Sequence, residues 1–167
     1  MSVRIPQRPV KIYSGHPKLG FLRPAITAAV HALDAAAVPS TERDRGSWRV
    51  PAGELSLAFL TDAALARLHA DFLSDPSPTD VITFPGDVAH GLAGEICISV
   101  DTAHSYAARH GREFAEELTL YLIHGYLHLA GYADHKTHER REIRAAERRA
   151  MAVLRTAKKS PEFEFRR

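Results

Sequence analysis

Two histidines, His124 and His128, lie four residues apart in a segment with the apolar spacing of a helix. Four residues complete slightly more than one helical turn, so both imidazoles project from one face with Cβ atoms roughly 5–6 Å apart. One nitrogen of each ring can then approach a single ion to about 2.0–2.1 Å, the usual zinc–imidazole distance. Burying two imidazoles on an apolar face is costly without such a partner. The pair therefore predicts a site for one transition-metal ion. Zn²⁺ is favoured, although nickel, cobalt and iron accept the same ligands.

A third ligand is expected from the segment that follows this helix. Gly131 is placed to end the helix, because glycine is common just after a helix C-terminus. The chain can then turn back, and either Asp134 or His135 can reach the open side of the same ion. Histidines at this spacing are a weak signal in a chain that has 10 of them. The glycine and the Asp-His pair behind it make a metal site the favoured interpretation.

The residue after the first histidine argues against one class of enzyme. In zinc peptidases with the pattern H-E-x-x-H, the glutamate is the general base. Gly125 stands at that position in this chain, so the base is missing. A bound metal could still activate a water molecule, but a zinc peptidase becomes the least favoured function.

Hydrophobic periodicity and helix-start signals predict the elements that position these residues. Strands are expected at 10–13, 54–60, 81–84 and 95–100, and helices at 24–37, 62–72, 101–110, 112–129 and 137–155. Asp101 or Thr102 is expected to cap the third of these helices. Proline-containing segments at 39–51 and 74–78 are expected to be loops. This mixture predicts one α+β layered domain over residues 1–160 with a small sheet, followed by a loose C-terminal tail at 161–167.

The composition is that of an ordinary globular protein, with 45% hydrophobic and 25% charged residues in a chain of 167. The formal net charge of +2 is too small to indicate nucleic-acid binding by itself. Cys97 is the only cysteine, which excludes an intrachain disulfide, fits a reducing compartment and favours a buried core position. The N-terminus lacks the apolar region of a signal peptide, and no apolar stretch could span a bilayer. We expect a cytoplasmic protein with no membrane partner.

Basic residues gather in the last predicted helix, at Arg140, Arg141, Arg144 and Arg148. Glutamates are interspersed with them, so a solvated helix face with ion pairs between successive turns is the simplest interpretation. The alternative is a surface that neutralises phosphates of a nucleic acid, in which case binding would weaken as salt is raised.

Several segments also resemble the YbeY family of bacterial ribosomal-RNA maturation factors and endoribonucleases. HGYLHLAGYADH at 124–135 is similar to the family signature H-G-x-L-H-L-x-G-Y-D-H. PTDVITFP at 78–85 is similar to P-T-D-V-L-S-F-P, and GEICIS at 94–99 to G-D-I-x-I-S. The segment from Glu116 to His124 resembles the lead-in E-L-x-x-L-x-x-H-G. The resemblance runs continuously from about Leu55 to Arg149.

The resemblance implies an endoribonuclease-like domain. Its fold would be a small mixed β-sheet flanked by helices, with the metal site at the end of a central helix. The implied activity is single-strand-specific RNA cleavage, in maturation of the three-prime end of small-subunit ribosomal RNA and in ribosome quality control. The implied partners are ribosomal RNA and the small ribosomal subunit, with no DNA. For such a function we expect the arginines of the last helix to neutralise backbone phosphates, although the resemblance itself does not assign them this role.

The first departure from the family pattern concerns the third ligand. The signature places its last histidine six residues after the second, where this chain has Asp134. We favour Asp134 over His135, because a carboxylate is a normal zinc ligand and no loop insertion is then needed. The other residue would orient a ligand or act as an acid or base. Asp80 is either an ordinary turn residue before a strand or a support for a ligand histidine. No catalytic residue is identified beyond a metal-activated water.

Leu73 is the second departure, because members of the family often carry an arginine there. Leucine cannot donate a hydrogen bond to a phosphate. An alternative to the endoribonuclease is therefore a non-catalytic zinc-binding ribosome-assembly factor, in which the zinc is structural or positions RNA. A closed site with both Asp134 and His135 bound would favour that alternative.

Overall fold

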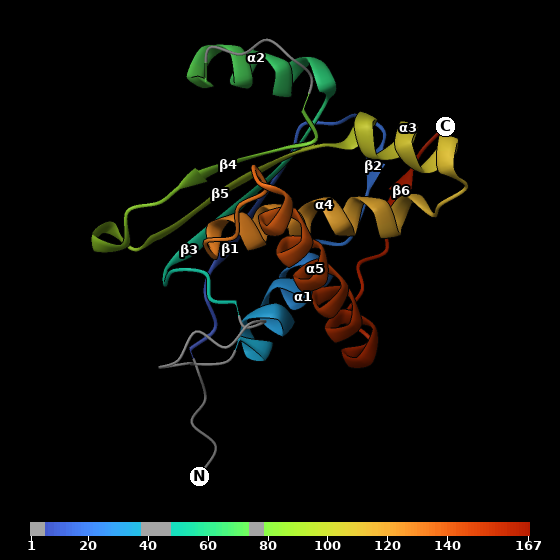
Figure 1. Cartoon of the computed structure of the whole chain (residues 1–167). Helices are drawn as coiled ribbons and strands as arrows, with labels where there is room; N and C mark the ends of the chain where they lie inside the picture. Colours follow the sequence, from blue (N-terminus) through green and yellow to red (C-terminus); the bar gives the residue numbers. More distant parts are fainter. Residues whose placement is uncertain (1–5, 38–47, 74–78) are drawn as a thin grey trace.

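The structure is a computed structural model, and it describes residues 6–37, 48–73 and 79–167. Figure 1 shows the elements along the chain. They are β1 (Val10–Ser14), β2 (Leu19–Gly20), α1 (Arg23–Ala36), β3 (Glu54–Leu60), α2 (Asp62–Leu73), β4 (Val81–Pro85), the 3₁₀ turn η1 (Val88–His90), β5 (Leu92–Ser99), α3 (Val100–His110), α4 (Phe114–Leu129), α5 (Thr137–Ala157) and β6 (Glu164–Phe165). The main sheet has the order β1-β3-β5-β4, with β1, β3 and β5 parallel and β4 antiparallel to β5. This mixed sheet with flanking helices confirms the predicted α+β fold.

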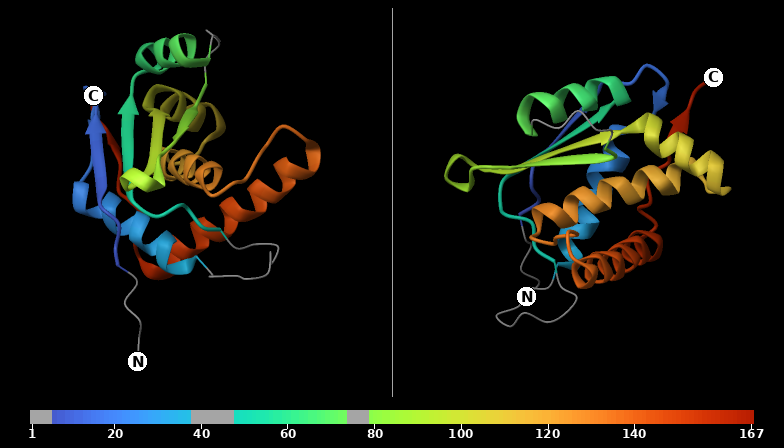
Figure 2. Two further views of the ribbon diagram at one scale, coloured as in Figure 1. Left: turned by 90° about the vertical axis from the view of Figure 1, so that its left-hand side faces the viewer. Right: turned by 45° about the horizontal axis from the view of Figure 1, so that its top comes forward.

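Helices cover both faces of the sheet, with α1, α4 and α5 on one side and α2 on the other (Figures 1 and 2). Side chains alternate along β3 accordingly. Leu57 and Phe59 enter the core shared with α1, α4 and α5, whereas Ala58 and Leu60 pack under α2. Cys97 of β5 is also buried under α2, as expected for a core residue, and burial raises the pKa of its thiol to about 12. In the described part of the chain, no helix has the length and apolar character needed to cross a membrane.

The predicted strands and helices are present with small shifts at their ends, and the cap of α3 differs. Ser99 caps α3, because its hydroxyl accepts a hydrogen bond from the backbone N–H of Thr102 at 3.0 Å. Asp101 instead accepts hydrogen bonds from His16 Nε2 at 2.8 Å and from the backbone N–H of Asp62 at 2.9 Å. Ser99 is thus both the last residue of β5 and the N-cap of α3, so β5 leads into α3 without a loop. The expected loops at 39–51 and 74–78 lie mostly or wholly outside the described residues.

Residues 161–167 are ordered against the body, so the expectation of a loose tail is wrong. Their strand β6 pairs antiparallel with β2. Phe163 is buried, with its ring centroid 5.4 Å from that of Phe59. Phe165 stacks on His104 with ring centroids 3.7 Å apart. The two phenylalanines alternate with charged residues, a period-two signal too short to be recognised as a strand from the sequence.

The helix α4 lies very close to the sheet at Gly125. A Cβ atom at this position would lie 2.3 Å from Cγ2 of Ile96 and 3.0 Å from Cγ1 of Val81. Nearby, the Tyr126 hydroxyl donates to Asp34 of α1 at 2.7 Å, and the Tyr126 side chain is fully buried. Residue 125 therefore faces the sheet, and any side chain there would have to displace those of Ile96 and Val81.

We predict that Gly125→Ala destabilises the protein by about 1–2 kcal/mol. Alanine improves helix propensity by ~1 kcal/mol, but overpacking a dense core typically costs about 1–3 kcal/mol. The short contact with Ile96 places this site at the costly end. Urea unfolding measures the change. Glu116→Ala on the exposed side of α4 serves as the control, expected to stay within about 0.5 kcal/mol of the wild type. A stabilised Gly125→Ala variant would contradict the close-packing argument.

Candidate metal centre

Three of the predicted ligand residues come together at the C-terminal end of α4. The Nε2 atoms of His124 and His128 are 2.9 Å apart. Asp134 Oδ2 lies 3.5 Å from the first of these nitrogens and 3.6 Å from the second. These residues form a group whose ligand atoms could hold one metal ion. Ligand atoms around a tetrahedral zinc with bonds of about 2.0–2.1 Å would be roughly 3.3 Å apart, so the triangle has the size that such an ion requires.

The end of α4 explains how a loop residue reaches two helical residues. Gly131 has φ +100°, a conformation that side chains rarely adopt. The backbone N–H of Tyr132 then donates to the carbonyl of Leu127 at 3.0 Å, as in a Schellman motif. His128 donates from Nδ1 to the carbonyl of Tyr132 at 2.9 Å. The turn thus brings the chain back over the last helical turn and carries Asp134 to the histidines.

Glu147 of α5 completes the surroundings of His124, and it is not among the site residues predicted from the sequence. Its Oε1 lies 2.6 Å from His124 Nδ1, and its side chain is 14% exposed. Glu147 follows Ile143 by one helical turn, in the buried stripe of α5. An acidic residue inside an apolar stripe was the available signal, because a buried carboxylate requires a partner. The exposed charges on the same helix obscure that signal in the sequence.

The hydrogen bonds define which nitrogen of each ring faces the centre. A carboxylate and a carbonyl accept hydrogen bonds and do not donate them. The Nδ1 atoms of His124 and His128 therefore carry their protons, and the Nε2 lone pairs face each other. Two lone pairs at this distance repel unless a proton or a cation lies between them. The donor set consequently fits a bound metal ion.

Charge around His124 also favours a cation. Burial by itself lowers the pKa of His124, but the hydrogen bond and charge of Glu147, with the charges of Asp80 and Asp134, raise it above its ordinary value overall. The same negative potential would act on a divalent ion. The site is therefore electrostatically prepared for positive charge even though it is partly shielded from water.

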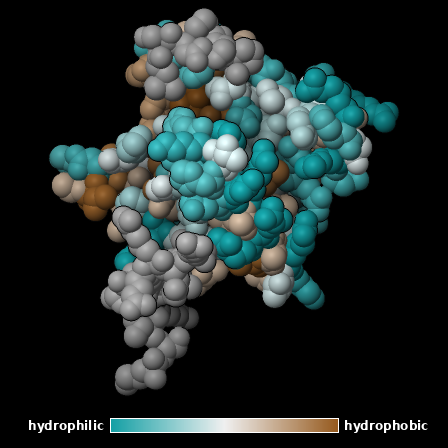
Figure 3. Space-filling model, viewed as in Figure 1, coloured by the Kyte–Doolittle hydropathy of each residue, from teal (hydrophilic) through white to brown (hydrophobic). Residues whose placement is uncertain are grey.

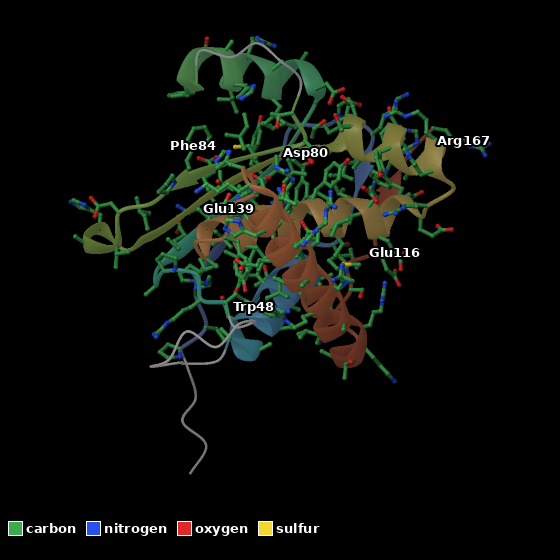
Figure 4. All side chains as sticks on the ribbon, in the orientation of Figure 1. Trp48, Asp80, Phe84, Glu116, Glu139 and Arg167 are labelled. Carbon is green, nitrogen blue, oxygen red and sulfur yellow. The ribbon has the colours of Figure 1, made fainter. Side chains whose placement is uncertain are left out.

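The remaining candidates do not belong to this group. His135 is exposed and is not part of the converging group. Asp80 precedes β4 (Figure 4), and its Oδ1 accepts a hydrogen bond from the backbone N–H of Val81 at 2.9 Å. Its charge acts on His124 through space.

Leu73 is the last residue of α2. Gly125 faces the sheet, so the position of a peptidase-type base is directed away from the histidines.

The four arginines of α5 that were predicted to contact RNA differ in their surroundings. Arg140 donates from one guanidinium nitrogen to the carbonyls of Asp134 at 3.2 Å and His135 at 2.8 Å, and thereby holds the ligand loop. Arg141, Arg144 and Arg148 are exposed along the helix. Figure 3 shows a mainly hydrophilic surface over α5. The same helix therefore supports the site with some side chains and presents positive charge to solvent with others.

Comparisons with known proteins agree with this picture. A family model described as endoribonuclease YbeY matches residues 26–155. The chain is 39% identical over 105 residues to the endoribonuclease YbeY of Protochlamydia amoebophila, covering 60% of this chain and 70% of the relative. It is 35% identical over 116 residues to that of Chlamydia abortus, covering 65% and 73% of the two chains.

A solved structure supports the fold independently. The solution structure of a Thermotoga maritima protein superposes with a TM-score of 0.52 at 23% identity, covering 90% of this chain and 94% of that one. The family model spans most of the chain, from α1 to the last turns of α5, and includes the whole converging group. This chain therefore belongs to the YbeY family of endoribonucleases.

Proposed function

We propose that this member of an endoribonuclease family is a metal-dependent enzyme that cleaves single-stranded RNA. The proposed substrate is the three-prime end of small-subunit ribosomal RNA, cleaved during maturation and ribosome quality control. The single observation that carries the metal dependence is the convergence of His124 Nε2, His128 Nε2 and Asp134 Oδ2, with both Nδ1 atoms engaged elsewhere. A ribosomal substrate implies a cytoplasmic protein, with the small subunit as partner and no DNA.

His124, His128 and Asp134 would hold one Zn²⁺ or a similar divalent ion, with His135 outside the ligand set. Three protein ligands leave one position of a tetrahedral site open, as in catalytic zinc sites. When bound, the ion would polarise a phosphoryl oxygen or lower the pKa of a bound water. Asp80, whose charge already acts on His124, would support the same ligand.

A non-catalytic assembly factor is the second candidate, and Leu73 is the observation in its favour. A leucine at that place cannot supply a phosphate contact. The exposed position of His135 weighs against the closed four-ligand site that this alternative predicts. A zinc peptidase is the third candidate. Its general base would have to arise from position 125, which faces the sheet.

The first prediction concerns cleavage of a labelled single-stranded RNA that carries the small-subunit three-prime end. The wild type should cut it, and His128→Ala should reduce the rate more than about 100-fold, beyond the 10–100-fold typical of losing a residue that only orients a ligand. Chelation should abolish cleavage by the wild type. His138→Ala, an exposed histidine on α5, is the matched control and should retain the rate.

Each other result has a defined meaning. Equal rates for wild type and His128→Ala would indicate a contaminating nuclease and remove the support for this enzyme. An inactive wild type that still binds zinc would replace the nuclease with the assembly factor. Cleavage of casein by the same preparation would favour the peptidase.

The second prediction separates the two candidate third ligands. Asp134→Ala should weaken zinc affinity more than about tenfold, because it removes an anionic ligand from a three-ligand site. His135→Ala should leave the affinity within about twofold, because its side chain points to solvent. Competition with a chromogenic chelator gives both affinities. Loss of zinc from His135→Ala with retention by Asp134→Ala would reverse the assignment.

The third prediction concerns the basic residues of α5 that we propose as RNA contacts: Arg140, Arg141, Arg144 and Arg148. Binding to single-stranded RNA should fall as salt rises, with a log–log slope of about −0.7 per neutralised phosphate. Replacing Arg141, Arg144 and Arg148 together by alanine should reduce the magnitude of that slope by about 2. Arg140 is kept because it holds the ligand loop. An unchanged slope would show that this surface does not contact RNA.

A further inference from the structure

We propose that Glu147 is a positioning residue that holds His124 in the tautomer with its proton on Nδ1. The Nε2 lone pair of His124 then faces the other two members of the converging group, His128 and Asp134. The part of this inference that concerns metal affinity rests on the proposed function. The part that concerns the tautomer does not, because it applies to the protein without any ion.

The contact itself has the features of a strong, specific interaction. Glu147 Oε1 and His124 Nδ1 are 2.6 Å apart, and the two side chains are 14% and 21% exposed. Hydrogen bonds to an ionised acceptor are shorter and stronger than neutral ones. Water competes weakly at this exposure. The carboxylate therefore favours a proton on the nitrogen that faces it and leaves the opposite nitrogen bare.

The two histidines need different partners because of their positions in α4. His128 lies in the last turn, where the chain folds back and supplies the carbonyl of Tyr132 as an acceptor at 2.9 Å. His124 lies one turn earlier, where the helix carbonyls are used by the helix itself. An acceptor for its Nδ1 must come from another element. The helix α5 packs on α4 and supplies Glu147.

The position of Glu147 in α5 is costly unless it serves such a partner. Ile143, Ala146 and Ala150 form the buried stripe of the helix around it. Alanine or leucine would pack in this stripe without burying a charge, and a buried carboxylate is unfavourable without compensating hydrogen bonds. The hydrogen bond to His124 provides this compensation. A side chain kept only for packing would have no need of the carboxylate.

The decisive experiment is long-range ¹H–¹⁵N NMR of the histidine rings in metal-free full-length protein, at alkaline pH where the rings are neutral. In the wild type, His124 should be the Nδ1–H tautomer. In Glu147→Ala, it should shift mainly to the Nε2–H tautomer, while His128, which is bonded to a backbone carbonyl, should not change. Glu142→Ala, an exposed glutamate on the same helix, should leave both rings unchanged.

Zinc affinity of the same variants then tests the consequence. Glu147→Ala should bind zinc roughly 10–100-fold more weakly than the wild type, and Glu147→Gln, which keeps an acceptor oxygen, should recover part of the loss. A His124 tautomer that is unchanged in Glu147→Ala would overturn the inference, even if the variant were less stable. A shifted tautomer in a protein that binds neither zinc nor a similar divalent ion would uphold the inference and defeat the proposed function instead.

Discussion

The close approach of α4 to the sheet at Gly125 is the constraint on which the site depends. The helix lies this close to the sheet with Gly125 toward the strands, where a Cβ atom would be only 2.3 Å from Cγ2 of Ile96. With residue 125 facing the strands, His124 and His128 must share a face that looks toward α5 and the loop after α4. Because Gly125 has no side chain, the helix packs in the orientation that determines where the two imidazoles point. Position 125, where a zinc peptidase would carry its glutamate base, faces the sheet.

The helix α5 provides the second support, and it acts on the ligand group from two places. Glu147 accepts a hydrogen bond from Nδ1 of His124. Arg140 donates to backbone carbonyls of the loop that carries Asp134. Neither contact involves the three atoms that could bind a metal, which are His124 Nε2, His128 Nε2 and Asp134 Oδ2. Both limit how far a ligand atom can move, which is the requirement for a site whose atoms must remain within a few tenths of an ångström of a working geometry.

The sequence was sufficient for features whose signals are local. Period-two and period-3.6 patterns located the sheet and the long helices. That His124 and His128 share one face of a helix followed from their spacing and from helix geometry. Asp134 was favoured over His135 from the register of the family signature, and its role as a metal ligand stays a prediction. Glu147 could not be selected, because its contact joins α5 to α4 and depends on how two helices pack. The β2–β6 pair was missed for a similar reason, since two-residue strands form only when distant segments meet.

The three residues of the ligand group differ in how firmly they are held. His124 and His128 are carried by one helix, with side chains 21% and 23% exposed, whereas Asp134 lies on a loop and is 38% exposed. Two of the three candidate ligands therefore lie on a helix packed against the core, and the third lies on the side more open to solvent. In the proposed function an RNA phosphate would approach from this open side. The arginines of α5 begin beside this side, where Arg140 contacts the loop that carries Asp134, so in that function the charge that would attract the RNA backbone and the group that would act on it lie next to each other.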